Sequence, residues 1–473
     1  MQKIIWSFLL FILLGLYFKN INENQKLLAF PSAEGSGALT VGGRGGKVIE
    51  VTNLDPEGIG SFRAACESKG KRTVVFKVGG TIDLEGKDIV IKNDYLTIAG
   101  QTALGDGIQI KNGGLRIMAN EVIVRYLRIR PGPAYPSATA LDIASPNRHN
   151  RKKNIIVDHV SAFWGVDETL NAGSFSDNVT IQWCIIAEGL HCSIYDGGKR
   201  GESWKPCKTI KSRKIWAHSR GSMVSEDSRN ITYHHNLFFN NFKRNPLVQS
   251  SDIHAVNNVM VNYQYQVYIQ PFKSNVRANF IGNYFRSHIH NRPPIRVYDF
   301  NNGYDGNSSI YYKDNYDSHF RADNSKPETS IRVLHFSKVD DKDGHVRDKK
   351  IPHSFSSVGI ESVHDAYKNV LLGVGAVYPK RDSTDKRVID FVKNGGSPKK
   401  FVNEPSDVGG WPTLKGGKSL LDSDYDGMPD SWEIEHNLNM NNPNDRNGKT
   451  LSSIGYTNLE VYLNSLINSH KLD

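Results

Sequence analysis

The sequence predicts an all-β solenoid, in which short strands stack as the coils of a parallel β-helix. Strand-like runs follow one another with few helical stretches between them, as in KVIEVTNL, TVVFKVGGTIDL and DIVIKNDYLTIAG. The second observation is a loose internal repeat. Its alternating apolar runs begin near Glu121, Asn154, Asn178, Asn230, Asp252 and Asn275. Several of these starts lie 22 to 24 residues apart, which indicates stacked units that cannot bury their apolar faces alone. Leucine-rich repeats share this period, but their leucine spacing is absent.

Asparagines recur at one place in successive units: Asn236 in HHNLF, Asn257 in NNVMV and Asn283 in GNYFR. Stacked asparagines can form a side-chain ladder along parallel strands. An asparagine can equally serve a left-handed bend of the backbone. Both interpretations require the same stacked fold.

The N-terminus reads as an export signal. An apolar run from Ile4 to Phe18 follows a single lysine, and this length suits a signal-peptide core but is short for a membrane span. We therefore expect residues 1–28 to be a signal peptide and the protein to be secreted, to the medium, the periplasm or the cell surface. No clear cleavage site follows, so an uncleaved anchor is the alternative.

Composition bounds the partners. The 473 residues are 38% hydrophobic and carry a net charge of +10. Such a chain can bury a large core and attracts anions such as nucleic acid, an acidic glycan or a membrane surface, among which charge alone does not choose.

The four cysteines match no zinc pattern. Cys192 and Cys207 can close the loop between them, whereas Cys66 and Cys184 lie in apolar runs and are expected to be buried thiols.

Residues 29–400 are expected to form the β-helix, and residues 401–473 a small C-terminal extension. The strand pattern weakens after Tyr316. Asp365–Val374 and Asp385–Val392 are expected to be short amphipathic helices against the outside of the stack.

The extension contains a calcium-loop pattern in DSDYDGMPDSWE. Oxygen-bearing side chains stand at its first, third, fifth, ninth and twelfth positions, namely Asp422, Asp424, Asp426, Asp430 and Glu433. Gly427 is sixth, where the loop turns sharply, and Met428 is seventh, where a carbonyl oxygen is the ligand. This spacing predicts a structural calcium site that orders the tail.

A second group of carboxylates follows the strand-like run NIIVDHV. Alternation places Asp158 on a surface, with Asp167 and Glu168 one short turn later. Three close carboxylates repel one another unless a cation lies between them, and calcium suits oxygen ligands. A solvated acidic edge is the alternative interpretation. Further along, Lys243 and Arg244 precede Pro246, and these two cations can hold an anionic substrate.

Motifs along nearly the whole chain resemble polysaccharide lyase family 1, and most closely the pectate lyases of Bacteroidetes type. These motifs include GGRGGKVIEVTNL, LTIAGQTALGDGI, NIIVDHVS, WGVDE, QWCII, HHNLF and RNP, and the tail motifs DVGGWP and GYTNLEVYLNSL. The resemblance implies a right-handed parallel β-helix. It also implies calcium-dependent β-elimination of (1,4)-linked galacturonan, an acidic polysaccharide, to 4,5-unsaturated products.

The resemblance also assigns residues. Arg244, in the R-x-P position, would be the base. Asp158 and Asp167 would be ligands of the catalytic calcium, and Glu168 is a weaker carry-over because relatives place a carboxylate where this chain has Phe163. His191 and Gln249 replace a lysine and an arginine of the family. Lys243, or Lys199 and Arg200, are the alternative cations for binding substrate.

Three competing functions remain open at this stage. One is a hydrolase on the same fold, although its NxD and DD motifs are absent. The others are a lyase for another uronic-acid polymer and a non-catalytic protein that binds acidic glycans at a surface. We expect a monomer without a nucleic-acid partner or a stable membrane span.

Overall fold

The computed structural model describes residues 27–195, 206–249, 251–262, 267–271, 275–287, 294–297, 308–318, 357–396, 398 and 400–468. Nearly all of the expected signal peptide lies outside these ranges, as do Lys199 and Arg200. Within them, no helix is long and apolar enough to span a membrane.

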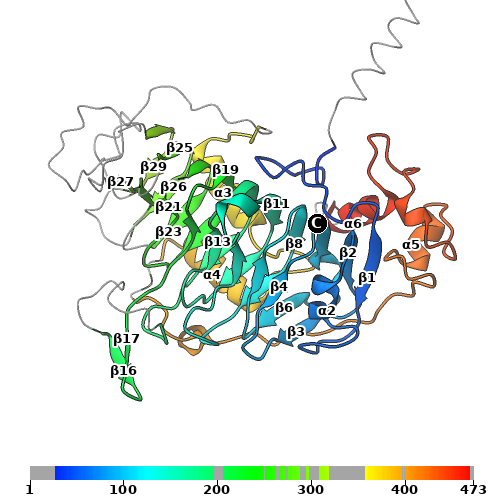
Figure 1. Cartoon of the computed structure of the whole chain (residues 1–473), viewed down its shortest axis with the longest axis horizontal. Helices are drawn as coiled ribbons and strands as arrows, with labels where there is room; N and C mark the ends of the chain where they lie inside the picture. The colour runs from blue at the N-terminus through cyan, green and yellow to red at the C-terminus, as the bar shows by residue number, and fades with distance from the viewer. Residues whose placement is uncertain are drawn as a thin grey trace, which may run out of the picture.

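Each coil of the chain adds one strand to each of three parallel sheets, which we call sheets A, B and C (Figure 1). Sheet A contains ten strands: β1 (Lys47–Val51), β2 (Arg72–Phe76), β5 (Leu96–Ala99), β8 (Val122–Arg125), β11 (Lys152–Asp158), β14 (Ser176–Gln182), β19 (Arg229–His234), β22 (Asp252–Val256), β25 (Arg277–Ile281) and β28 (Ser309–Lys313).

Sheets B and C run along the same stack. Sheet B contains nine strands: β3 (Gly80–Asp83), β6 (Ile108–Lys111), β9 (Arg128–Arg130), β12 (Ser161–Phe163), β15 (Ile185–Ala187), β20 (Leu237–Phe239), β23 (Val259–Val261), β26 (Tyr284–Arg286) and β29 (Tyr316–Asp317). Sheet C contains eight: β4 (Ile89–Ile91), β7 (Leu115–Ile117), β10 (Leu141–Ile143), β13 (Leu170–Ala172), β18 (Met223–Val224), β21 (Leu247–Gln249), β24 (Val267–Gln270) and β27 (Ile295–Val297). The prediction of a parallel β-helix is confirmed.

The core is a set of aliphatic columns inside the coils. Ile155 pairs with Val122 in one neighbouring strand and with Val179 in the other. The same column continues through Ile231, Ile253, Ala278 and Ile310. Burying each valine or isoleucine is worth roughly 1.5–3 kcal/mol. Repetition of this column fixes the register, because a shift by one residue would turn it outward.

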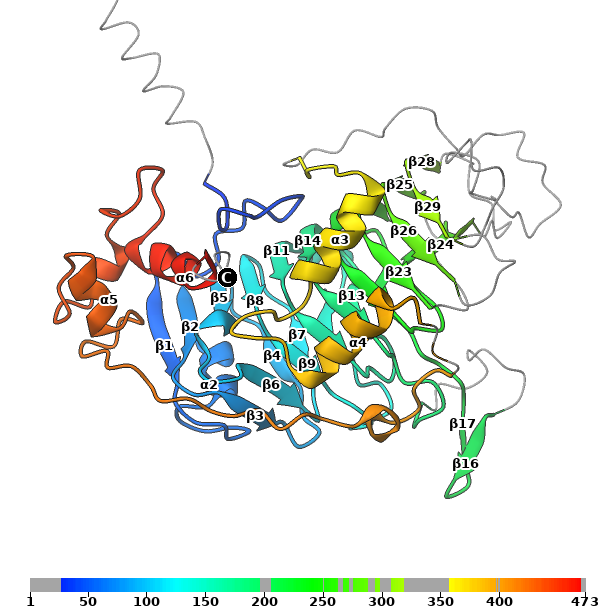
Figure 2. The same cartoon turned by 180° about the vertical axis from the view of Figure 1, so that it is seen from behind.

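Helices cover one end and one side of the stack. α2 (Phe62–Glu67) begins at the N-cap Ser61 and places Phe62, Ala65 and Cys66 in the core at the N-terminal end. α3 (Val363–Gly373) and α4 (Ser383–Lys393) lie across the outer face of sheet B (Figure 2). Both outer helices confirm the prediction from amphipathic spacing. The shorter 3-10 helices are η1 (Gly100–Thr102), η2 (Arg148–Asn150), η5 (Pro405–Val408) and η6 (Asp445–Asn447).

The predicted ladder of asparagines is present, but it contains Asn258 in place of the predicted Asn257. The Nδ2 group of Asn236 donates to Oδ1 of Asn258 at 2.9 Å, Asn258 donates to Asn283 at 2.9 Å, and Asn283 donates to Asn315 at 2.8 Å. Asn257 instead adopts a left-handed φ of 53°. Both interpretations of the asparagines are therefore correct, at neighbouring residues.

Cysteine use agrees with the sequence. Cys192 and Cys207 form a disulfide, and Cys66 and Cys184 are buried thiols. Beyond the disulfide, β16 (Lys208–Ile210) and β17 (Arg213–Ile215) form an antiparallel hairpin that extends from the body in both views.

The C-terminal residues run back along the stack to its first coils. Trp411 Nε1 donates to the Arg130 carbonyl at 2.8 Å, and the Asp106 amide donates to the Lys415 carbonyl at 2.8 Å. α5 (Asp430–Glu435) and α6 (Asn458–Asn468) then lie beside β1 and β2 (Figure 2). Met428 and Leu459 pack there against Val75 of β2.

Candidate active site

The candidate site is built from the turn between sheets B and C in three successive coils. The first turn carries Asp167 and Glu168 before β13, the second carries His218 and Arg220 before β18, and the third carries Lys243 and Arg244 before β21. Backbone hydrogen bonds stack these turns, from the Thr169 amide to the Gly221 carbonyl at 3.0 Å and from the Gly221 amide to the Lys243 carbonyl at 3.0 Å. Residues distant in the sequence are thereby held side by side.

Asp167 is held by a histidine from the next coil. Its Oδ1 lies 2.9 Å from Nε2 of His218, whose ring stacks on Tyr195 with 3.6 Å between ring centroids. Burial alone would raise the pKa of Asp167, but the hydrogen bond and charge of His218, together with Arg244 and Arg220, hold this pKa below its usual range. The lowered pKa favours the negatively charged form of Asp167 in the site.

Arg244 forms an ion pair with Glu168 across two coils. Its Nη1 contacts the Glu168 carboxylate and lies 3.5 Å from the sulfur of Met223. The Arg244 side chain is only 24% exposed. Burial lowers the pKa of the guanidinium, and the charge of Asp167 opposes this decrease. Burial thus shifts the half-buried Arg244 toward the neutral form that a proton acceptor needs, while its ion pair with Glu168 favours the charged form.

Asp142 and Asn171 complete the group, and the sequence reasoning missed both. They are direct partners in the pairing of β10 with β13. Burial raises the pKa of the Asp142 carboxyl, while Arg116 and Asn171 oppose the rise and the Asp167 carboxylate adds to it. The signal in the sequence was one polar residue inside each of two equivalent apolar triplets, LDI and LNA.

Oxygen donors dominate this cluster. Ligand atoms of Asp167, Glu168 and His218 lie within 4.8 Å of one another. The negative charge of Asp167 also contributes to the raised pKa of Asp142. Carboxylates and amide oxygens suit a hard cation such as calcium, whereas Glu168 is already paired with Arg244. Asp167 is therefore the carboxylate of this group that is left for a cation, and Asp142 is the next carboxylate whose pKa responds to the charge of Asp167.

Comparisons with known proteins show the family to which the chain belongs. No family model matches the chain. A protein of Aspergillus flavus named probable pectate lyase C is 35% identical over 455 residues, covering 95% of this chain and 96% of the relative. A protein of the same name from Aspergillus fumigatus is 35% identical over 450 residues, covering 94% of each. This chain belongs to the pectate lyase family.

A solved structure supports the fold of this family member. The crystal structure of jun a 1, the major allergen from cedar pollen, aligns with a TM-score of 0.51 at 16% identity. The alignment covers 72% of this chain and 92% of the allergen. At this identity the likeness concerns the fold alone.

Asp158 lies apart from the other carboxylates of this family member. It ends β11 in sheet A, where Oδ2 accepts from Arg125 Nε at 2.8 Å and Oδ1 accepts from Gln182 Nε2 at 2.8 Å. Asp158 is 0% exposed, although strand alternation placed it on a surface. The reason is that residues 29–38 cover this face of sheet A. Its oxygens already have partners, and the structure does not bring it to Asp167 and Glu168.

The predicted substrate-binding residues have separate environments. Lys243 Nζ lies 5.5 Å from the ring centroid of Tyr268 in β24. The His191 ring stacks on Phe242 with 4.8 Å between centroids, and its carbonyl accepts from the His218 amide at 2.8 Å. Lys243 thus adjoins Arg244 in the third turn, while His191 is packed between aromatic rings.

The predicted calcium loop brings most of its carboxylates together. Asp422, Asp424 and Asp426 form one group, and Asp426, Glu433 and Asp445 form a second. Burial raises the pKa of Asp426 to about 8 and that of Glu433 to about 7, and neighbouring carboxylates add to both increases. Asp430 is directed elsewhere, because it accepts from the amide and hydroxyl of Ser423, both at 2.7 Å. The Met428 side chain is buried.

Proposed function

We propose that this family member is a secreted, calcium-dependent pectate lyase that cleaves (1,4)-linked galacturonan by β-elimination, with Arg244 as the base. The observation that supports the proposal is the half-buried Arg244 guanidinium, which pairs with Glu168 and lies within the electrostatic influence of Asp167 in three stacked turns. The pectate lyase names of relatives covering nearly the whole chain support the substrate class.

The reaction requires removal of the proton on C5 of a uronate. The neutral form of Arg244 takes this proton, and the C5–H electron pair forms the C4=C5 double bond. The C4–O4 bond breaks, and the departing oxygen takes a proton from solvent. Burial of Arg244 favours its neutral form. Both contacts described for Arg244 involve Nη1, so Nη2 is the nitrogen that we assign to the proton transfer.

Asp142 and Asp167 would hold the calcium ion, which supplies positive charge that makes the C5 proton more acidic when the uronate carboxylate is bound. Glu168 is assigned to hold Arg244 in position rather than to bind metal. Lys243 adds a second positive charge next to Arg244 for the anionic polymer. Asp158 has no part in this proposal.

The test is ultraviolet absorbance during incubation with polygalacturonate, with calcium and with chelator. The parent protein should give a calcium-dependent rise from the conjugated product. Arg244→Ala should lower kcat about 100- to 10,000-fold. Arg229→Ala is the matched control, because Arg229 is an exposed arginine at the start of β19 and its loss should leave kcat unchanged.

Two outcomes would replace the proposal. New reducing ends without a rise in absorbance would identify a hydrolase. Binding of the polymer by a folded protein, with neither product, would identify a glycan-binding protein. A rise only on another uronic-acid polymer would keep the chemistry and change the substrate.

A further inference from the structure

The C-terminal extension contains a carboxylate cluster that extends beyond the twelve-residue loop. Ligand oxygens of Asp422, Asp424 and Asp426 lie within 4.8 Å of one another, and so do those of Asp426, Glu433 and Asp445. Asp426 belongs to both groups and so joins them. Asp445, in η6, lies twelve residues after Glu433.

Most of these oxygens are buried without a partner among the described residues. This is true of both oxygens of Asp424 and of Glu433, of Oδ2 of Asp426 and of Oδ1 of Asp445. Asp426 and Glu433 are 0% exposed. Burying a carboxylate without a cation or a donor is costly, and such a group normally pairs or binds a metal.

The hydrogen bonds and the ion pair within the loop show which of its oxygens already have partners. Asp422 accepts from the Asp426 amide at 3.2 Å and from the Gly427 amide at 3.1 Å, and it forms an ion pair with Lys77 of the connection after β2 at 2.9 Å. Gly427 has a left-handed φ of 92°, and an added Cβ would lie 3.2 Å from Val48. The turn is thus already formed, with its unpaired oxygens gathered at one place.

We propose that one calcium ion binds this cluster through Asp422, Asp424, Asp426, Glu433 and Asp445, and that it fastens the extension onto the first coils of the β-helix. The all-oxygen, carboxylate-rich set suits calcium better than zinc or magnesium. Asp445 provides a ligand from outside the loop, while Asp430 is occupied by Ser423.

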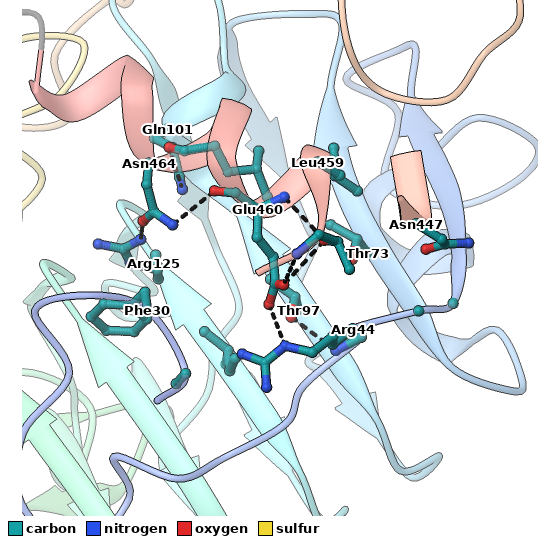
Figure 3. Close-up of a pocket in the computed structure, with 17 residues that line it drawn as sticks. Phe30, Arg44, Thr73, Thr97, Gln101, Arg125, Asn447, Leu459, Glu460 and Asn464 are labelled. Atoms are coloured by element: carbon teal, nitrogen blue, oxygen red, sulfur yellow. Dashed lines mark hydrogen bonds and ion pairs between the residues drawn. The ribbon is translucent and has the colours of Figure 1, made fainter. Parts of the chain in front are cut away.

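The position of the cluster gives the ion its role. Met428, between two ligands of the loop, packs with Leu459 and Tyr462 of α6 against Val75 and Ala99 of sheet A. Figure 3 shows the other attachments of α6, in which Glu460 pairs with Arg44 at 2.7 Å and Asn464 accepts from Arg125 at 3.1 Å. The ion would join the loop to η6, and so hold the C-terminal extension against the outer face of the first strands of sheet A.

The experiment measures thermal unfolding and limited proteolysis of the full protein with calcium, with magnesium and with chelator, in the absence of substrate. Calcium should raise Tm by several degrees and protect the extension, and magnesium should do neither. The Asp142→Asn/Asp167→Asn double variant should keep this response, because it changes only the two carboxylates assigned to the catalytic calcium. The result is therefore independent of the proposed lyase activity.

Ligand variants test the assignment of each residue. Glu433→Gln and Asp445→Asn, in the double-variant background, should each weaken calcium binding at least about tenfold by calorimetry. Asp430→Asn is the matched control and should keep most of the affinity. Equal Tm with calcium and chelator would overturn the proposal. Unchanged affinity in Asp445→Asn would overturn the role of η6.

Discussion

Glu168 and Asp142 both carry a carboxylate in one site, but their neighbouring residues differ and indicate different roles. Glu168 contacts the Arg244 guanidinium. Asp142 stands beside Asn171 in the next coil, with Arg116 Nε at 3.6 Å on its other side. Under the proposed function, the first arrangement positions the base, whereas the second provides a carboxylate that can bind a cation together with Asp167.

Substitutions should separate these two roles. Glu168→Gln should lower kcat about 100-fold through misplacement of Arg244, with little change in the calcium concentration that gives half-maximal rate. Asp142→Asn should raise that concentration at least about tenfold, and rates at saturating calcium should largely recover. Initial rates on polygalacturonate in calcium buffers measure both quantities.

A matched control for Glu168 exists elsewhere in the molecule. Glu188 is also buried and is paired with an arginine, Arg387, through bonds of 2.8 and 2.7 Å. Glu188→Gln should change stability and leave kcat unchanged. If Glu168→Gln instead raised the calcium requirement, Glu168 would be a metal ligand, as the sequence analysis proposed.

Single residues of the site were only partly predictable from the sequence. Arg244 stands in a motif, and Asp167 and Glu168 are adjacent. Alternation correctly turned Asp158 outward from the core, but alternation does not say which of three sheets a strand joins or what covers it. Residues 29–38, remote in sequence, cover that face. Asp142 was missed because one acidic residue in a strand is indistinguishable from a solvated position.

At the scale of elements, the turn from sheet A to sheet B is held by a column of rings. Tyr126, His159, Trp183 and His235 occupy this turn in successive coils, each with a left-handed φ between 52° and 56°. Ring centroids are separated by 4.7, 6.0 and 4.5 Å. Stacking of this kind offsets the cost of a left-handed backbone in bulky residues.

His235 makes this column sensitive to acid. Burial lowers its pKa to about 4, and the Glu361 carboxylate, 3.6 Å away, opposes the decrease. Its other neighbour, His234 at 3.0 Å, also has a lowered pKa because it is buried. The unfolded chain therefore binds more protons than the folded protein between pH 6.5 and 4. Stability contributed by neutral His235 is present above pH 6.5 and is lost as the pH falls toward 4.

The expected loss is about 3 kcal/mol for this residue. Denaturant unfolding at pH 7 and at pH 4.5 should therefore show a smaller difference in free energy of unfolding for His235→Asn than for the parent. Asparagine suits the position, because Asn257 occupies it in the next coil with a φ of 53°. His149→Asn, at an exposed residue of η2, should leave the difference unchanged. An unaltered pH dependence in His235→Asn would contradict the assignment.

The asparagine ladder shows how far a repeat predicts an element. The repeat located the coil, but NNVMV offers two asparagines, and only the fold shows that Asn258 joins the ladder while Asn257 makes the bend. The ladder also begins at a residue of another type. Cys184 occupies the preceding coil, with its amide donating to Asn236 Oδ1 at 2.9 Å.

At the scale of the whole molecule, the period of 22 to 24 residues was enough to predict the stack, because each coil must bury the same kind of apolar face. The packing at the ends of the stack could not be predicted in this way. α2 fills the N-terminal end, and the tail returns along sheet B to the same end. Such contacts join residues hundreds of positions apart, and no local pattern encodes them. Asp445 was absent from the predicted calcium ligands for another reason, because it lies outside the twelve-residue loop pattern.

Charge is distributed so that one basic element lies beside the site. Lys211, Arg213 and Lys214 are exposed in the hairpin of β16 and β17. The chain leaves this hairpin through Trp216, whose amide donates to the Tyr195 carbonyl at 3.1 Å, and reaches His218 two residues later. For a protein with a net charge of +10, this position can direct a polyanion toward the turns that carry Arg244.

The triple variant Lys211→Glu, Arg213→Glu, Lys214→Glu should therefore raise KM for polygalacturonate several-fold at low salt, with kcat unchanged. The difference from the parent should shrink between 10 and 200 mM NaCl, because the screening length falls from about 30 Å to below about 10 Å. Lys393→Glu, Lys418→Glu, Lys449→Glu changes net charge equally at exposed lysines outside the hairpin. If both triple variants raised KM alike, net charge rather than the hairpin would attract the polymer, since only a local effect depends on where the charges lie.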